Sequence, residues 1–320
     1  MDRRGHWPHW STGDTQPYMS RRSTAAALCL TLLASGSVAL GARCLSPAVA
    51  RCSWAALTGN GPALDVPYLG TRPAVIARML DMAAVGPGDR VLDLGTGDGR
   101  ILIAAARRGA SGTGVDIDPV LISEARAAAL TAGVAERTRF VAQDLFATPL
   151  SGNTVVTMFL LPRVNLRLRP RLLRELPPGT RIVSHAFDMA DWAPDVTDQV
   201  SGSNLYLWRV PAAVAGEWVL DDGARLSMHQ NFQILGGTLS RLGQVETLTN
   251  GVLSGSRIRF SAGGRSFEGV VNGGTIKGVG WNARRVTADS LPRTVWPKIG
   301  HSESHWTLPK SDARSPSKIS

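Results

Sequence analysis

The feature that most constrains the fold is the run from Val91 to Arg100, which reads Val-Leu-Asp-Leu-Gly-Thr-Gly-Asp-Gly-Arg. Its apolar first half is typical of a buried strand. Its three alternating glycines lack a Cβ atom where the chain has to bend sharply, and they let a ligand approach the backbone. Residues 101–108 are predicted to be helical, so their first N–H groups would face whatever lies over the turn. The pattern therefore predicts a nucleotide-like site at the end of a parallel strand.

The spacing of the glycines indicates which ligand the turn binds. A dinucleotide site has the pattern Gly-x-Gly-x-x-Gly, which serves a pyrophosphate, whereas here the glycines alternate and Asp93 stands two residues before the first. The run resembles motif I of the class I S-adenosylmethionine (SAM) methyltransferases, whose loop holds the amino-acid end of a ligand without a phosphate. The resemblance implies cofactor contacts from Asp93, Gly95, Thr96, Gly97, Asp98 and Gly99.

Two further strand ends fit the same cofactor. A short strand over residues 113–117 ends in Asp116, about 20 residues beyond Gly95, where a carboxylate can accept hydrogen bonds from both ribose hydroxyls. Asp118 is the neighbouring carboxylate that could be confused with it. A strand over residues 140–142 leads to Asp144, which resembles the family residue that binds the adenine amino group. We expect Ile117 and Leu145 to contact the cofactor beside these acids.

Charge and cysteine content exclude some classes. The formal net charge is +10, but most of the excess lies outside residues 53–213, so nucleic acid is not an expected partner. The three cysteines are Cys29, Cys44 and Cys52. Because none lies in the predicted enzyme core, we expect neither a cysteine-ligated zinc site nor a thiolate nucleophile, and no metal is predicted.

The first 52 residues are predicted to be a leader. Arg21 and Arg22 precede an apolar stretch over residues 25–42, and Ala48-Val49-Ala50 resembles a cleavage site. The pattern fits a signal peptide of an exported, periplasmic protein, and the apolar stretch is also long enough to be considered as an uncleaved membrane anchor. A cytoplasmic location remains the alternative, because SAM is made there.

Residues 53–213 are predicted to form an α/β domain with a seven-stranded, Rossmann-like sheet. Thr71 is expected to cap a first helix that ends near Ala84, and Pro170 to start a second helical segment after the basic run from Arg163. A closing hairpin is expected to turn at Gly202-Ser203-Asn204. The remaining predicted elements are strands over 155–160 and 181–184, a helix over 119–132, and hairpin strands over 195–200 and 205–210.

The composition changes after residue 213. Residues 214–288 alternate between apolar and polar positions, with turns expected at Gly236-Gly237, Asn250-Gly251, Gly263-Gly264 and Asn272-Gly273-Gly274. This pattern predicts a small antiparallel β-domain, a meander that closes into a sandwich or barrel. Because the β-domain has no motif with chemistry, we expect it to select or tether the substrate and to take no part in methyl transfer. Residues 289–320 are predicted to be disordered.

Four stretches together resemble the protein-lysine methyltransferase family that includes the ATP synthase c-subunit lysine methyltransferase. They are Val66-Pro67-Tyr68, residues 97–100, residues 159–162 and the run from Arg181 to Pro194, and the resemblance covers about residues 64–210. It implies SAM as cofactor and a protein lysine as substrate. A small-molecule or lipid-borne amine is an alternative acceptor. The alternative outside enzymes is a non-catalytic protein with the SAM-binding fold, in which the β-domain is a binding module.

A lysine nucleophile must lose its proton before it can attack, so a lysine methyltransferase needs a proton acceptor. His185 and Asp188, just after the strand over 181–184, are the candidates. Tyr68 and Trp192 are predicted to wall the substrate channel. Three of these residues also have an ordinary structural interpretation: His185 as a strand-end residue, Asp188 as a cap and Trp192 as part of the core.

Overall fold

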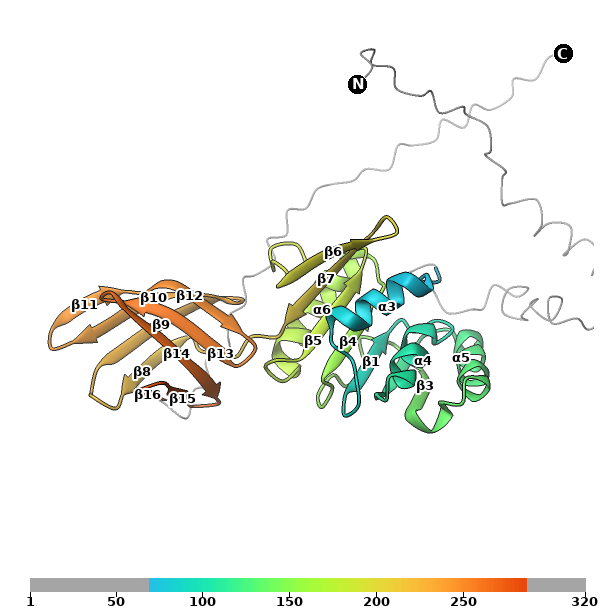
Figure 1. The fold of residues 1–320 in the computed structure, drawn as a ribbon, viewed down its shortest axis with the longest axis horizontal. Helices are drawn as coiled ribbons and strands as arrows, with labels where there is room; N and C mark the ends of the chain where they lie inside the picture. Colours follow the sequence, from blue (N-terminus) through green and yellow to red (C-terminus); the bar gives the residue numbers. More distant parts are fainter. Residues whose placement is uncertain (1–68, 287–320) are drawn as a thin grey trace, which may run out of the picture. The chain divides into compact units, whose positions relative to one another are not determined.

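The computed structural model describes residues 69–286, which contain two separate sheets (Figure 1). The first sheet has the strand order β3-β2-β1-β4-β5-β7-β6. Strands β1 to β5 are parallel, whereas β7 is antiparallel to both β5 and β6. Its strands are β1 Arg90–Leu94, β2 Ser111–Asp116, β3 Thr138–Ala142, β4 Val155–Met158, β5 Arg181–His185, β6 Val196–Val200 and β7 Ser203–Arg209. The predicted seven-stranded α/β fold is confirmed.

Helices cover both faces of this sheet. The helices are α3 Pro73–Met82, α4 Arg100–Arg107, α5 Pro119–Thr131 and α6 Pro162–Glu175, with a short 3-10 turn over Ala135–Arg137. One core cluster joins α3, α4 and α5 to the sheet through residues such as Leu80, Leu102 and Ile122. A second joins α6 to the other face through Leu168 and Leu172. The order of the strands reverses between β1 and β4, where ligands bind in open α/β sheets.

Two expectations about helix ends were wrong. Thr71 does not cap α3, because Arg72 holds the cap position and Pro73 occupies the first turn, where its missing N–H costs nothing. Pro170 does not start a new segment but lies inside α6. One lost backbone hydrogen bond is tolerated there because α6 buries a row of leucines on either side of the proline.

The hairpin of β6 and β7 also turns one residue earlier than predicted. Ser201 and Gly202 form the turn, with φ angles of 52° and 78°. Two successive positive φ values are those of the tight turn whose twist matches the flanking strands. Ser203 and Asn204 therefore belong to β7.

The second sheet is an antiparallel meander that closes on itself, and we call it the barrel. Strands run in the order β11-β10-β12-β13-β14-β15-β16-β8-β9, and β9 also pairs with β10, which closes the ring. Strands β11 and β12 pair in succession with the edge of β10 that β9 does not occupy. The strands are β8 Gly216–Leu220, β9 Arg225–Asn231, β10 Ile234–Arg241, β11 Gln244–Thr247, β12 Thr249–Ser254, β13 Arg257–Ala262, β14 Arg265–Asn272, β15 Thr275–Gly278 and β16 Asn282–Arg285. Its interior is filled by side chains that include Trp218, Phe260 and Phe267. The predicted β-domain architecture is confirmed as a barrel.

Two of the four predicted barrel turns were wrong. Gly236 and Gly237 lie within β10, and Asn250 and Gly251 lie within β12, where the pairing shifts register. A Cβ atom on Gly237 would lie 1.9 Å from the carbonyl oxygen of Ser227 on β9. These glycines therefore allow two strands to approach closely, and the chain turns at Phe232 and at Leu242 instead, both in the left-handed region.

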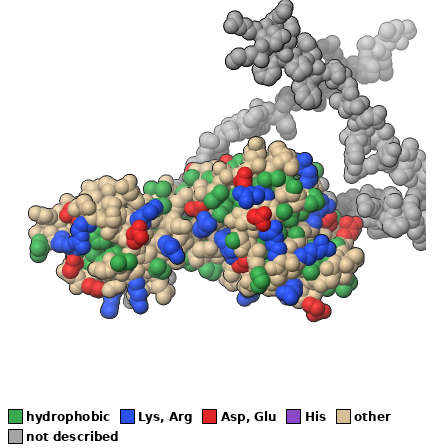
Figure 2. All heavy atoms as spheres, viewed as in Figure 1, with side chains coloured by type: hydrophobic (Ala, Val, Ile, Leu, Met, Phe, Trp, Pro, Cys, Tyr) green, Lys and Arg blue, Asp and Glu red, His purple; other side chains and the backbone are tan. Residues whose placement is uncertain are grey.

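Several predictions lie outside the described residues. They concern the leader over residues 1–52, Tyr68 and the tail over residues 289–320. Among residues 69–286, no helix combines the length and the apolar character needed to cross a membrane. Figure 2 shows cationic and acidic side chains interspersed on the visible face, without one continuous basic stretch.

Candidate functional site

The glycine-rich loop after β1 adopts a conformation that depends on its glycines. Gly95, Gly97 and Gly99 have φ angles of 74°, 55° and 79°, which side chains rarely tolerate. A Cβ on Gly95 would lie 2.7 Å from the Leu160 side chain, and one on Gly99 would lie 2.7 Å from the Phe140 ring. Gly99 is also the cap residue from which α4 starts. Phe140 on β3 and Leu160 just after β4 therefore pack directly against the loop.

Asp93 organises this loop from inside the protein. Its carboxylate accepts hydrogen bonds from the Thr96 hydroxyl at 2.7 Å and the Thr157 hydroxyl at 2.6 Å, so it connects β1, the loop and β4. The side chain is fully buried, and this burial raises the pKa of Asp93 to about 6, although both hydrogen bonds lower it. Because the carboxylate is buried and both of its oxygens are bonded within the protein, Asp93 shapes the loop.

Asp116 and Asp118 have different roles in the structure. Asp116 accepts the Gly97 N–H at 2.8 Å and the Asp118 N–H at 3.1 Å, one on each oxygen. Asp118 caps α5 by accepting the Val120 N–H at 2.8 Å. A carboxylate has about four acceptor positions, so Asp116 can bind two hydroxyls in addition. Ile117 follows at 41% exposure and offers an apolar surface beside them.

The exit of β3 lies next to that of β2. The Gln143 N–H donates to the Asp116 carbonyl at 2.8 Å, which brings the two loops together. Asp144 is exposed, and one of its oxygens accepts the Phe146 N–H at 2.8 Å. Leu145 is half-buried. The structure therefore brings together Asp116, Ile117, Asp144 and Leu145 at adjacent ends of parallel strands, an arrangement that fits a ribose and an adenine.

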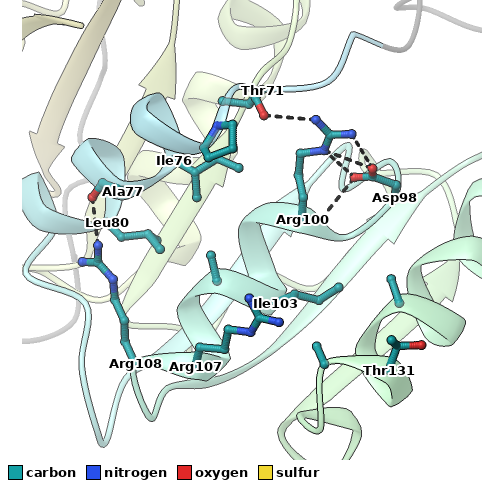
Figure 3. Close-up of a pocket in the computed structure, with 14 residues that line it drawn as sticks. Thr71, Ile76, Ala77, Leu80, Asp98, Arg100, Ile103, Arg107, Arg108 and Thr131 are labelled. Atoms are coloured by element: carbon teal, nitrogen blue, oxygen red, sulfur yellow. Dashed lines mark hydrogen bonds and ion pairs between the residues drawn. The ribbon is translucent and has the colours of Figure 1, made fainter.

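Asp98, by contrast, is engaged with Arg100. The guanidinium of Arg100 contacts both oxygens of Asp98 at 2.5 to 3.0 Å and donates to the Thr71 carbonyl at 3.1 Å. This group lines a pocket of about 620 Å³ between α3, α4 and α5. Figure 3 shows Arg100 and Asp98 among the residues that line it. Arg100 thereby links the glycine-rich loop to the segment that enters α3.

His185 ends β5 at the same edge of the sheet. Its Nδ1 atom lies 3.2 Å from the Thr71 hydroxyl oxygen, and its ring centroid lies 3.9 Å from that of Phe159, at the exit of β4. The residue is 6% exposed. Burial lowers the pKa of His185, and the positive charge of Arg72 lowers it further. The imidazole is therefore held in its neutral form near pH 7, in which one ring nitrogen can accept a proton.

Asp188 and Trp192 do not join His185 as predicted. Asp188 is exposed and accepts the Ala190 N–H at 3.1 Å, which matches its interpretation as a cap. Trp192 is 1% exposed, and its ring packs 5.8 Å from both Trp208 and Phe232. The prediction that Trp192 walls an open channel is wrong, because the ring belongs to the core.

Two residues of α6 that no sequence motif singled out hold the segment after β5, residues 186–193, which we call the β5 loop. Asn165 is fully buried and donates to the carbonyls of Phe187 and Asp188, both at 3.2 Å. Arg169 is also buried; it donates to the Met189 carbonyl at 2.7 Å and pairs with Asp191. The signal that could have revealed them is a pair of polar residues, four positions apart, on the apolar side of a helix.

Comparisons with known proteins agree with this geometry. A family model described as the ANTKMT methyltransferase domain matches residues 93–196. A protein-lysine N-methyltransferase of Saccharolobus islandicus is 44% identical over 142 residues, which cover 44% of this chain and 88% of the relative. The ATP synthase c-subunit lysine N-methyltransferase of Xenopus laevis is 33% identical over 41% of this chain and 58% of its own length. The matched part of the chain thus spans a little over half of that eukaryotic relative.

A solved structure described as an RNA methyltransferase from Salinibacter ruber in complex with S-adenosyl-L-homocysteine is also similar. It is 49% identical, covers 46% of this chain and 96% of its own, and has a TM-score of 0.45.

Proposed function

Because this chain belongs to the family of class I SAM-dependent methyltransferases that contains the Saccharolobus protein-lysine N-methyltransferase, we propose that it transfers a methyl group to a lysine side chain of a protein. SAM supplies the methyl group in an already activated form, on a sulfonium. The protein therefore has to hold the cofactor, place the amine in line with the methyl group and remove a proton from the amine. Placement alone can supply roughly 7–11 kcal/mol of the barrier.

The observation that supports the proposal is the position of a buried, neutral imidazole at the edge where the residues predicted to bind the cofactor lie. His185 ends β5 and Asp116 ends β2, and parallel strands end on the same side of a sheet. A lysine ammonium that enters this edge is desolvated, which lowers its pKa. His185 is the proposed proton acceptor. Asp188 is a weaker candidate, because its carboxylate is exposed and caps a turn.

A radioactive methyl group identifies the class of acceptor. The full-length protein would be incubated with methyl-tritiated SAM and an extract of the source organism, and the protein fraction would be acid-hydrolysed. We expect radioactivity in methylated lysines. Radioactivity confined to the lipid or small-molecule fraction would contradict the proposal and support the alternative amine acceptors.

Two variants test the assignment of His185. His185→Gln should lower kcat roughly a hundredfold, the usual contribution of a positioned proton acceptor, while SAM affinity measured by calorimetry stays unchanged. Asp188→Asn is the matched control and should retain most activity. Equal losses in the two variants would show that His185 is not the proton acceptor.

The leader adds a proposal about location. We propose that residues 25–42 direct export or anchor the protein in a membrane, on the basis of the sequence alone. Sequencing of the N-terminus from the native host should find a start near Arg51 if the leader is cleaved. A start at Met1 or Met19 in a soluble cytosolic fraction would contradict export.

A further inference from the structure

The barrel contributes one aromatic side chain to the core of the first sheet. Phe232 sits at the turn between β9 and β10, yet it is 3% exposed and belongs to the core cluster of α6 and β4. Its φ angle is +52°, in a region that bulky residues avoid. The turn therefore holds an unfavourable backbone conformation, and in that conformation the ring is buried outside the barrel.

Phe232 contacts one residue of the β5 loop, Trp192, and one of the α6 residues that hold the loop, Arg169. Its ring is stacked on Trp192, with the ring centroids 5.8 Å apart and an interplanar angle of 13°. The guanidinium of Arg169 also lies over the Phe232 ring, 5.2 Å from the ring centroid. The next residue, Gln233, donates from its side chain to the Ala193 carbonyl at 2.8 Å. The barrel thus touches the loop at Trp192 and Ala193.

The same loop is also held from α6, at residues 187–189 and at Asp191. Asn165 binds the carbonyls of Phe187 and Asp188, and Arg169 binds that of Met189. Arg169 is shared, because it touches both the loop and Phe232. His185 immediately precedes the loop, and Ala186 continues the chain with a φ angle of +68°. A shift of residues 187–193 would therefore reach His185 through Ala186 and through the Phe187 N–H, which donates to the His185 carbonyl at 2.9 Å.

We propose that Phe232 is a positioning residue for methyl transfer, which acts by clamping the β5 loop against α6 and so fixes His185 at the edge of the first sheet. This inference rests on the proposed function for the role of His185. It also revises the expectation that the β-domain takes no part in methyl transfer. Trp192 and Arg169, which Phe232 touches, lie after β5 and on α6, whereas the cofactor residues follow β1, β2 and β3. The clamp should therefore affect the part of the site that holds the methyl-accepting amine, which we call the acceptor side, and should leave SAM binding unchanged.

Hydrogen exchange of the full-length protein tests the clamp without any substrate. In Phe232→Ala, the backbone amides of residues 186–193 should exchange at least tenfold faster than in the unmodified protein, whereas those of residues 93–117 should not change. Phe267→Ala is the matched control, because it removes a phenyl ring of the same size from the barrel interior. Its loop amides should exchange at the unmodified rate. Gln233→Ala removes the hydrogen bond to Ala193 alone and should accelerate exchange of the Ala193 region about threefold.

Kinetics then separate positioning from a merely structural role. With the methyllysine assay, Phe232→Ala should lower kcat about tenfold while calorimetry finds SAM affinity within twofold of the unmodified protein. Unchanged loop exchange in Phe232→Ala would overturn the inference, as would equal acceleration in Phe267→Ala. If Phe232→Ala does not fold, unchanged exchange in Gln233→Ala would overturn it. Absence of methyllysine in every variant would refute the proposed function and leave the clamp to be decided by exchange.

Discussion

The two sheets of this protein distribute their polar residues in different ways. In the first sheet, β1 to β5 run parallel, so all five carboxyl ends lie at one edge, and Asp116, Asp144 and His185 gather there. In the barrel, neighbouring strands are antiparallel, so strand ends alternate between two rims and polar side chains such as Arg257 and Arg259 point outward along the strands. Strand direction, more than residue composition, therefore decides where chemistry can concentrate.

The largest expected effect would come from removing a strand-end carboxylate of the parallel sheet. Asp116→Ala deletes the expected acceptor for two ribose hydroxyls, each hydrogen bond being worth roughly 1.5–3 kcal/mol, so SAM affinity should fall about a hundredfold or more. Calorimetry measures the change. Asp118→Ala is the matched control and should leave SAM affinity nearly unchanged, because Asp118 caps α5. Equal losses in the two variants would mean that the wrong carboxylate has been assigned to the ribose.

An interior residue of the barrel should affect stability without affecting the cofactor. Phe260 is fully buried and stacks on Phe267 with centroids 4.9 Å apart. Phe260→Ala should cost about 3–5 kcal/mol in the free energy of unfolding, while SAM affinity of the folded fraction stays within twofold. Denaturation and calorimetry together check this, and a large loss of SAM affinity would show that the barrel completes the cofactor site.

The buried acid of the parallel sheet should make stability depend on pH. The pKa of Asp93 is raised from 3.8 to about 6 by burial, so its favourable contribution is fully present below pH 3.8 and is lost as the pH rises through about 6. At 1.36 kcal/mol per pKa unit, the loss is about 3 kcal/mol. Relative to Asp93→Asn, the unmodified protein should therefore lose stability between pH 4 and pH 7. A difference that stays constant over this range would contradict the assignment.

The smallest expected effect concerns a strained turn. Leu242 is fully exposed and has a φ angle of 49° between β10 and β11, followed by Gly243. Leu242→Asn creates an Asn-Gly pair, which favours this conformation, and should stabilise the protein by roughly 0.5–1 kcal/mol. Thermal denaturation checks the change. Leu248→Asn, at a buried barrel position, is the control and should destabilise instead.

The sequence was sufficient for the elements whose signals are local. Glycines at fixed spacing predicted the loop after β1, and the acids after β2 and β3 follow apolar runs that could be recognised alone. The barrel turns were harder, because a glycine pair is used both for turning and for close strand approach. Gly237 illustrates the second use, since only the neighbouring β9 explains why no side chain fits there.

The acceptor side of the site could not be predicted because it depends on tertiary contacts. Trp192 stands in a run of loop residues, and nothing local shows that Trp208 and Phe232 bury it. Asn165 and Arg169 are polar residues of a basic helix, yet both face inward to bind carbonyls of a distant loop. Phe232 lies more than 40 residues beyond His185 and occupies a turn that was expected a few residues later.

Closure of the barrel has a consequence for the order in which the protein is completed during synthesis. Its first strand, β8, pairs with its last, β16, through Leu220 and Ala283. Such non-local pairing forms late and slowly, whereas the first sheet has all its strands once Arg209 has been made. We therefore expect a growing chain to acquire its cofactor site well before the barrel can press Phe232 onto the β5 loop. The enzyme would then become fully active only after its last strand is in place.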